Sequence, residues 1–147
     1  NVAENGRLIA LIHKLGQADR PGFQVGSYFY MHNTGSGKAL LAAKPTSYVD
    51  RVVDYWGLPA ETHKTITDRD ELLRDLERAE ERGYSICDEE WLEGFRSVGR
   101  AVRGPDGEVL GAMAVGGPIY RLDMKKIRNE IGEMLIEAVD TLEAEVR

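Results

Sequence analysis

A glycine-rich segment at residues 31–38, MHNTGSGK, offers the residue types that contact polar ligands, and an apolar run follows it at once. This pattern predicts a turn that opens a helix, where free backbone N–H groups favour an anion or a polar oxygen. The letters GSGK suggest a nucleotide phosphate loop, but that motif needs glycine where His32 stands and a hydroxyl residue where Ala39 stands. We therefore expect a ligand-contacting loop without nucleotide chemistry, with Lys38 on the helix surface or at a subunit contact.

Few residues have the spacing of an enzyme active site. Cys87 is the single cysteine. It is either a nucleophile, if a base such as His32 or His63 lowers its pKa, or a buried or pocket-wall thiol, and we favour the second. His13 falls in an apolar run and is interpreted as a strand residue. The acidic residues 88, 89, 90 and 93 form an acid/base pair, a cation site or a solvated turn, and we favour the turn. We expect no catalytic residue, no metal and no cofactor.

Two expected strands carry small residues on one face. Side chains alternate along a strand, so residues 95, 97, 99 and 101 share a face of the first, and residues 110, 112, 114 and 116 share a face of the second. Such faces either let a helix sit close to the sheet or leave a cavity. Together with the open helix start at Ser36, they favour a ligand cavity.

Composition limits the class of protein. The 147 residues fit one domain, 1–147, and the net charge of -6 with scattered basic residues argues against nucleic-acid binding by this chain. One cysteine excludes an internal disulfide and fits a reducing cytoplasm. No apolar stretch is long enough for a bilayer and no signal peptide is evident, so we expect no membrane partner. Because the chain begins at Asn1, close to a predicted strand and without an initiator methionine, we expect it to be one domain of a longer polypeptide.

Local patterns predict an α+β fold in which helices pack on an antiparallel sheet. Extended segments are expected at 7–13 and 23–30, and strands at 84–88, 95–103 and 108–115, the last two joined by a tight turn at 105–107. A first helix follows the glycine-rich segment. A second begins at a Thr46 cap and ends at Gly57, and a third begins at a Thr67 cap and ends at Gly83.

The last expected element is a long amphipathic helix that begins at a cap on Asp123. Apolar residues recur there at intervals of three and four, which is the period of a helix with one buried face. The residues predicted to lie on that face are Met124, Ile127, Ile131, Leu135, Ala138 and Leu142.

Several motifs in this order resemble the effector-binding domain of IclR-type transcriptional regulators. They are the loop at 31–42, the segments 65–68 and 82–96, and Gly117-Pro118 before the last helix. The resemblance covers nearly the whole chain. It implies a GAF-like curved antiparallel sheet flanked by helices, and an N-terminal winged helix-turn-helix domain, absent from this chain, that binds DNA. It also implies homodimers that pair into tetramers, and small organic or aromatic acids as effectors.

The resemblance also assigns site residues. It places Gly35 and Ser36 where backbone N–H groups meet the effector's carboxylate. Cys87 stands where an aspartate is common, although Asp88 follows it. Serines common in relatives are replaced at positions 114 and 116, and Arg100 replaces a small apolar residue. The implied effector site comprises Phe23, Gly35, Ser36, Cys87, Asp88, Phe95, Ser97, Ala114 and Gly116.

These replacements predict a pocket that is roomier and less polar than in relatives that sense two- or three-carbon acids. We therefore expect a larger, aromatic effector whose binding changes the packing of sensor domains. Two alternatives stay open at this point: a GAF-like interaction module that binds no ligand, and an enzyme that uses Cys87.

Overall fold

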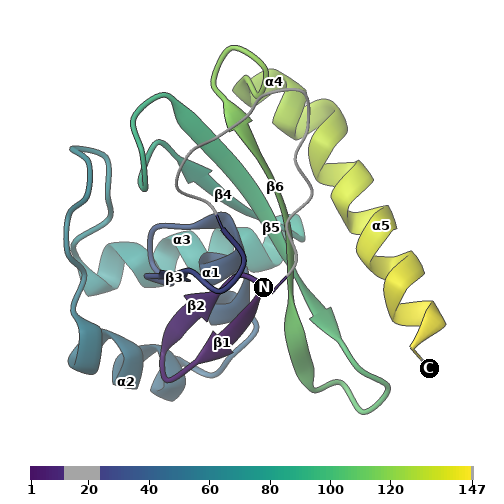
Figure 1. Cartoon of the computed structure of the whole chain (residues 1–147), viewed down its shortest axis with the longest axis horizontal. Coiled ribbons are helices and arrows are strands. Elements are labelled where there is room, and N and C mark those ends of the chain that lie inside the picture. The colour runs from purple at the N-terminus through teal and green to yellow at the C-terminus, as the bar shows by residue number, and fades with distance from the viewer. Residues whose placement is uncertain (12–23, 147) are drawn as a thin grey trace.

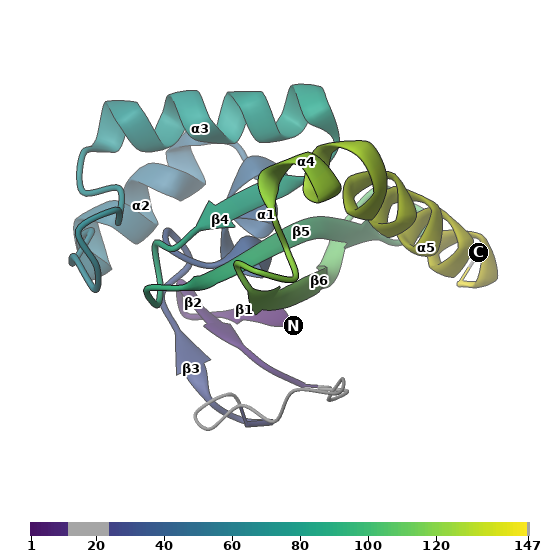
Figure 2. The same ribbon diagram turned by 90° about the horizontal axis from the view of Figure 1, so that it is seen from above.

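The computed structural model describes residues 1–11 and 24–146, which form two antiparallel sheets and surrounding helices (Figure 1). The α+β class expected from the sequence is confirmed. Part of the expected strand 7–13, with His13, lies outside the described residues, as does Phe23. Helix α1 (Gly35–Ala42) contacts the larger sheet on one side, and the C-terminal helix α5 (Gly132–Glu145) contacts it as well (Figure 2).

The smaller sheet consists of β1 (Val2–Glu4), β2 (Arg7–Ile9) and β3 (Tyr28–Phe29). A two-residue turn joins β1 to β2, and both Asn5 and Gly6 have positive φ there, at 50° and 75°. Asn-Gly is the preferred pair for such a hairpin turn because both residues tolerate the left-handed region. This hairpin was not predicted, although the Asn5-Gly6 turn signal is present in the sequence.

The larger sheet has the order β4 (Ser85–Asp88), β5 (Phe95–Arg103) and β6 (Val109–Pro118). The bounds of β5 are those predicted. The expected β5–β6 hairpin is confirmed, and its turn closes through the Gly107 N–H, which donates to the carbonyl of Gly104 at 3.0 Å. Strand β6 continues three residues beyond its predicted end because Phe95 pairs with Pro118.

Two predicted helix caps were each wrong by one residue. Helix α2 (Thr46–Trp56) has Pro45 in the capping position, so Thr46 already lies in the first turn. Helix α3 (Arg69–Arg82) is capped by Asp68, whose carboxylate accepts from the N–H of Glu71 at 2.9 Å. Asp68 has the extended backbone that a capping residue needs, and a carboxylate is at least as good an acceptor there as the hydroxyl of Thr67.

The C-terminal helical segment begins at Asp123, as predicted, with α4 (Met124–Lys126). It continues through a π-helical turn (Ile127–Ile131) into α5. A π turn holds more residues than an α turn, so the residues that follow are shifted around the helix axis. This shift buries Val139 and leaves Ala138, which the sequence pattern had placed on the buried face, exposed to solvent.

Buried apolar side chains form two clusters. The cluster around α1 includes Leu8, Phe29, Met31, Leu40, Leu41, Val49 and Leu72. The cluster beneath α5 includes Tyr84, Ile86, Val98, Val102, Ile127, Leu135 and Val139. Because Ile86, Val98 and Val102 alternate with Cys87, Ser97 and Gly99 along their strands, the larger sheet presents different faces to α1 and to α5.

Candidate ligand site and the pocket beside it

Helix α1 begins inside the protein. Every residue from Met31 to Leu41 is buried. Thr34 caps the helix by accepting from the N–H of Gly37 at 3.2 Å, and its hydroxyl also lies 3.1 Å from the carbonyl of Tyr30. The expected turn opening a helix is therefore present, and its start lies against β5.

Contact between α1 and β5 is unusually close. The N–H of Gly35 donates to the Ser97 hydroxyl at 3.1 Å, and a Cβ added to Gly99 would lie 2.2 Å from the carbonyl oxygen of Gly35. No side chain larger than hydrogen fits at Gly99 without displacing the helix. At this position the small strand residues let α1 pack directly against β5, so the prediction of a cavity was wrong here.

Strand register brings several predicted site residues into one row. Cys87 pairs with Ser97, and Ser97 pairs with Gly116, so the three lie side by side across β4, β5 and β6. The Phe95 ring covers Gly116, since a Cβ there would lie 2.6 Å from the ring. Together with Gly35, which bonds Ser97, these residues form what we call the strand row: Gly35, Cys87, Phe95, Ser97 and Gly116. Ala114, paired with Gly99, lies exposed next to it.

Two other predicted site residues have different environments. The Ser36 hydroxyl is buried and accepts from the side-chain amide of Asn1 at 2.6 Å. Asp88 alternates with Cys87 and so projects from the other face of the sheet, where it accepts from Arg96 at 2.6 Å. The carboxylate of Asp88 therefore does not replace the aspartate that the resemblance expected at position 87.

Lys38 is the centre of a buried ion network, and its predicted place on the helix surface was wrong. Its side chain is 1% exposed, and its ammonium lies 2.6 Å from Asp75 Oδ2, 2.9 Å from Glu90 Oε1 and 2.7 Å from the carbonyl of Ile86. Burial lowers the pKa of Lys38, but the carboxylates of Glu90 and Asp75 outweigh it, so the pKa stands above its usual value. Lys38 therefore ties α1 to α3 and to the chain around β4.

The acidic residues after β4 are used by the structure itself. Glu90 pairs with Lys38, Glu89 with Lys64 at 3.1 Å, and Glu93 with His63 at 3.2 Å. Within residues 1–11 and 24–146, no group of three or more His, Cys, Asp and Glu side chains is placed to hold a metal ion. The described helices include none with the length and apolar character needed to cross a membrane.

Cys87 does not have the environment of a nucleophile. It is 1% exposed, its thiol donates to the carbonyl of Asn33 at 3.0 Å, and burial raises its pKa to about 11. The proposed bases have other partners, because His32 lies 3.0 Å from the Pro59 carbonyl oxygen and His63 is exposed beside Glu93. The geometry is that of a buried thiol and gives no support to a cysteine-dependent enzyme.

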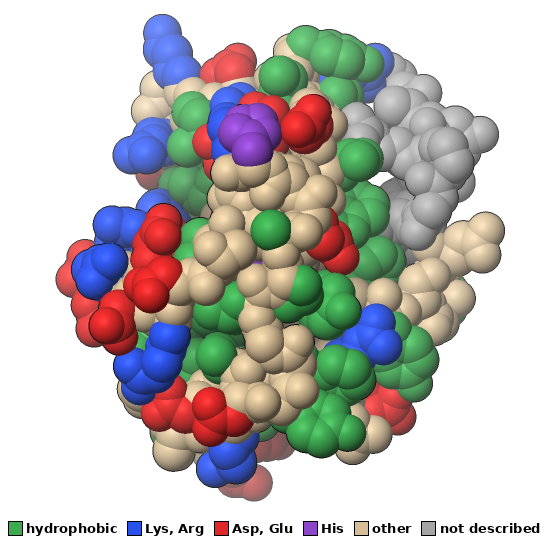
Figure 3. All heavy atoms as spheres, turned by 90° about the vertical axis from the view of Figure 1, so that its left-hand side faces the viewer, with side chains coloured by type: hydrophobic (Ala, Val, Ile, Leu, Met, Phe, Trp, Pro, Cys, Tyr) green, Lys and Arg blue, Asp and Glu red, His purple; other side chains and the backbone are tan. Residues whose placement is uncertain are grey.

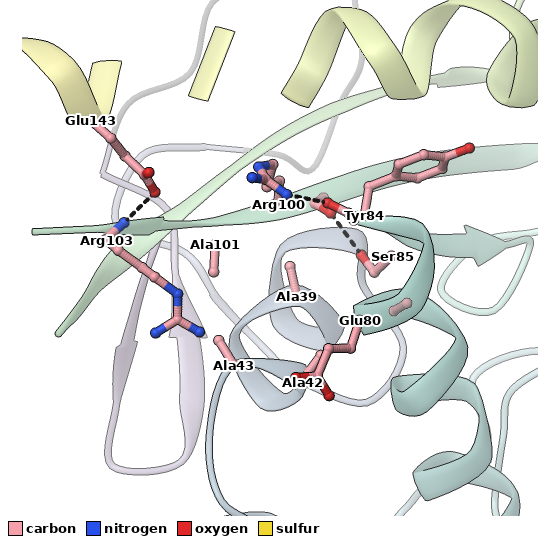
Figure 4. Close-up of a pocket in the computed structure, with 13 residues that line it drawn as sticks. Ala39, Ala42, Ala43, Glu80, Tyr84, Ser85, Arg100, Ala101, Arg103 and Glu143 are labelled. Atoms are coloured by element: carbon pink, nitrogen blue, oxygen red, sulfur yellow. Dashed lines mark hydrogen bonds between the residues drawn. The ribbon is translucent and has the colours of Figure 1, made fainter. Parts of the chain in front are cut away.

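A separate pocket of about 160 Å³ lies toward the other end of α1 (Figure 4). No residue of the strand row lines it. Its floor is rich in alanine, and charged side chains stand at its rim: Glu80, Arg100, Arg103 and Glu143. Apart from the unusual arginine at position 100, no sequence pattern indicated this pocket, because its walls come from five separate elements, α1, α3, β4, β5 and α5.

Surface charge on one face of the molecule can be followed in Figure 3. Acidic and basic side chains are interspersed there, and no continuous basic stripe is seen on that face. Nucleic-acid binding requires such a concentration of Lys and Arg. The face in view therefore has the character expected from the net charge of -6.

Comparison with known proteins identifies the family. Residues 3–144 match the family described as "Bacterial transcriptional regulator IclR C-terminal". The chain is 34% identical over 114 residues to the transcriptional repressor IclR of Escherichia coli (strain K12), a match that covers 78% of this chain and 41% of the repressor. The chain therefore belongs to the family of IclR C-terminal domains, and it spans less than half the length of that relative.

Solved structures share the fold. The crystal structure of the Thermotoga maritima IclR protein matches with a TM-score of 0.90 and 23% identity, over 99% of this chain and 57% of that one. The inducer-binding domain of PobR from Acinetobacter, a double mutant in complex with 3-hydroxybenzoic acid, matches with a TM-score of 0.84 and 20% identity, over 97% of this chain and 84% of that one. At these identities the likeness establishes the arrangement of helices and strands.

Replacing Lys38 should strongly destabilise the domain. Lys38→Met leaves two carboxylates beside an uncharged side chain and without their cation. Breaking a buried ion pair in this way costs about 3–5 kcal/mol. Urea denaturation should show this loss, and the triple variant with Asp75→Leu and Glu90→Leu should recover much of it. Lys64→Met is the control, because its ion pairs are exposed and its loss should change little. Equal stability of the Lys38 and Lys64 variants would contradict the assigned role.

The thiol of Cys87 should react slowly in the folded protein. With a pKa of about 11, only about one part in a thousand is thiolate at pH 8, and the group is buried as well. Labelling with a disulfide reagent at pH 8 should therefore be orders of magnitude slower than in denaturant, and should accelerate as the pH rises. Rapid labelling of the folded protein at neutral pH would reopen the possibility of a reactive thiol.

Proposed function

We propose that this chain is the ligand-sensing domain of a bacterial cytoplasmic transcriptional regulator, whose DNA contacts are made by a separate N-terminal winged helix-turn-helix domain. The observation that carries the proposal is the family match over residues 3–144. The structure adds support, because five of the nine residues that the resemblance assigns to the effector lie together in the strand row at the start of α1.

The chemistry of the strand row favours a ligand with a larger apolar part than a two- or three-carbon acid. The N–H of Gly35 is taken by Ser97, Cys87 carries a neutral thiol, and Ala114 and Gly116 offer no hydroxyl. Each missing bond to a charged group removes about 1.5–3 kcal/mol of attraction for a carboxylate. The Phe95 ring offers an apolar contact instead. We propose a small aromatic acid as the effector, a class that includes the 3-hydroxybenzoic acid bound by the related PobR domain.

Sensing requires the ligand to prefer one arrangement of the protein over another. We propose that effector binding changes the packing of sensor domains in a homodimer or tetramer, and so the spacing of the DNA-binding domains. Coupling of this kind is typically worth about 1–3 kcal/mol. An interaction module that binds no ligand is the competing function, and the following experiment distinguishes the two.

Binding of 3-hydroxybenzoate to this domain tests the proposal. We expect saturable binding by calorimetry that weakens at least about tenfold in Ala114→Phe, which places a ring beside the strand row, since a factor of ten is only about 1.4 kcal/mol. The matched control is Val115→Phe, on the opposite face of the same strand, which should bind normally. Absence of binding by the folded wild-type domain to this acid and to a panel of other aromatic acids would favour the interaction module.

A further inference from the structure

The pocket in Figure 4 exists because β4 is shorter than β5. Strand β4 begins at Ser85, opposite Gly99, so no strand among the described residues pairs with that edge of β5 from Arg100 to Arg103. Helix α1, the end of α3 and helix α5 surround the edge and leave the space open. The floor of the pocket is made by side chains too small to fill it, namely Ala39, Ala42, Ala43, Ala79 and Ala101.

Arg100 brings unused donors to this pocket. One terminal nitrogen donates to the carbonyl of Gly83 at 2.7 Å and the other to Asp140 at 3.1 Å, while Nε is buried and makes no hydrogen bond within residues 1–11 and 24–146. A guanidinium has five N–H donors, so further bonds are open to it. Arg103 lines the same pocket, and its Nη1 donates to Gly107 at 2.9 Å. Guanidinium groups with free donors recognise carboxylates.

Acidic groups at the rim restrict the charge of an occupant. Glu143 accepts from the backbone N–H of Arg103 at 2.8 Å. Glu80, on the α3 side of the pocket, makes no hydrogen bond or ion pair to the part of the chain that the structure describes. A ligand with negative charge alone would approach this carboxylate unfavourably, whereas an ammonium group would be attracted to it.

We propose that this pocket is a second small-molecule site, which binds a short zwitterion carrying a carboxylate and an amine. The carboxylate pairs with Arg100, the ammonium faces Glu80, and the apolar middle of the ligand covers the alanine floor. The pocket shares no residue with the strand row, so this inference does not depend on the aromatic effector proposed above.

Asp140 gives the site a built-in competitor. Its carboxylate already bonds Arg100, but 58% of its side chain is exposed, so the pair is held weakly in water. A ligand carboxylate that takes the place of Asp140 would free the middle of α5 from β5. Binding at this site would therefore alter the contact of α5 with the sheet.

The test uses 4-aminobutyrate as the probe and butyrate as the matched ligand that lacks the amine, both titrated into the labelled domain by NMR. We expect 4-aminobutyrate to shift the NMR signals of Ala101 and Ala43. It should bind at least about tenfold more tightly than butyrate, a difference of about 1.4 kcal/mol. Arg100→Leu should weaken binding at least as much. Asp140→Asn should strengthen it several-fold, and Glu80→Gln should remove most of the preference for the amine.

The variants separate this site from the strand row. Ala101→Phe fills the pocket and should abolish binding of 4-aminobutyrate, whereas Ala114→Phe should leave it intact. Loss in Ala114→Phe with retention in Ala101→Phe would overturn the inference while leaving a sensor domain in place. Failure of the folded wild type to bind 4-aminobutyrate at millimolar concentration would also overturn it, even if 3-hydroxybenzoate binds. If Arg100→Leu fails to fold, the affinities of Asp140→Asn and Glu80→Gln for 4-aminobutyrate still test the inference, and wild-type affinity in both would overturn it.

Discussion

The buried ammonium of Lys38 is the interaction on which the arrangement of this domain depends. It joins α1 to Asp75 on α3 and to Glu90 and Ile86 around β4, three parts of the chain that are far apart in sequence. Taking three charged groups out of water is costly, and only good geometry offsets the cost. That requirement favours a single placement of α1, since a displaced helix would leave charges buried without partners.

The fixed helix has a different role at each of its ends. At its start, the Gly35 N–H meets Ser97, and Gly99 leaves no room for a larger residue, so the strand row is held against the helix. Toward its other end the side chains are too short to fill the space between α1 and the neighbouring elements, and the pocket with charged residues at its rim remains there. These side chains are Ala39, Ala42 and Ala43. One rigid element thus positions both places where a ligand is proposed, which makes α1 a physical link between them.

Much of the fold could be predicted from local patterns. Strand β5, the turn at Gly107 and the cap at Asp123 depend on nearby residues, and the sequence contains those residues in full. The caps at Thr46 and Thr67 failed by one position because neighbouring residues compete for the same role. Ala138 failed because a π turn earlier in the helix changed the phase of the pattern, and nothing in the local sequence marks that turn.

The site was harder to predict because it depends on contacts between distant segments. Motif order pointed to Cys87, Ser97 and Gly116, and strand register does place them in a row. Lys38 was misplaced, since a charged residue is predicted to be exposed until its partners are known. Asp88 lies on the face of the sheet opposite to Cys87, because side chains alternate along β4. The partners of Lys38 lie 37 and 52 positions away along the chain. The pocket beside Arg100 was missed for the same reason, because it exists only where β4 stops short of β5.

Native-state hydrogen exchange of α1 is the most direct test of this account. If the Lys38 network fixes the helix, the buried amides of Ala39, Leu40 and Leu41 should exchange only through global unfolding, with the same free energy as Val98 in the centre of the sheet. Exchange of these amides through a local opening far less costly than global unfolding would show that α1 moves independently of the sheet. That result would contradict the claim that one buried ammonium holds the site in place.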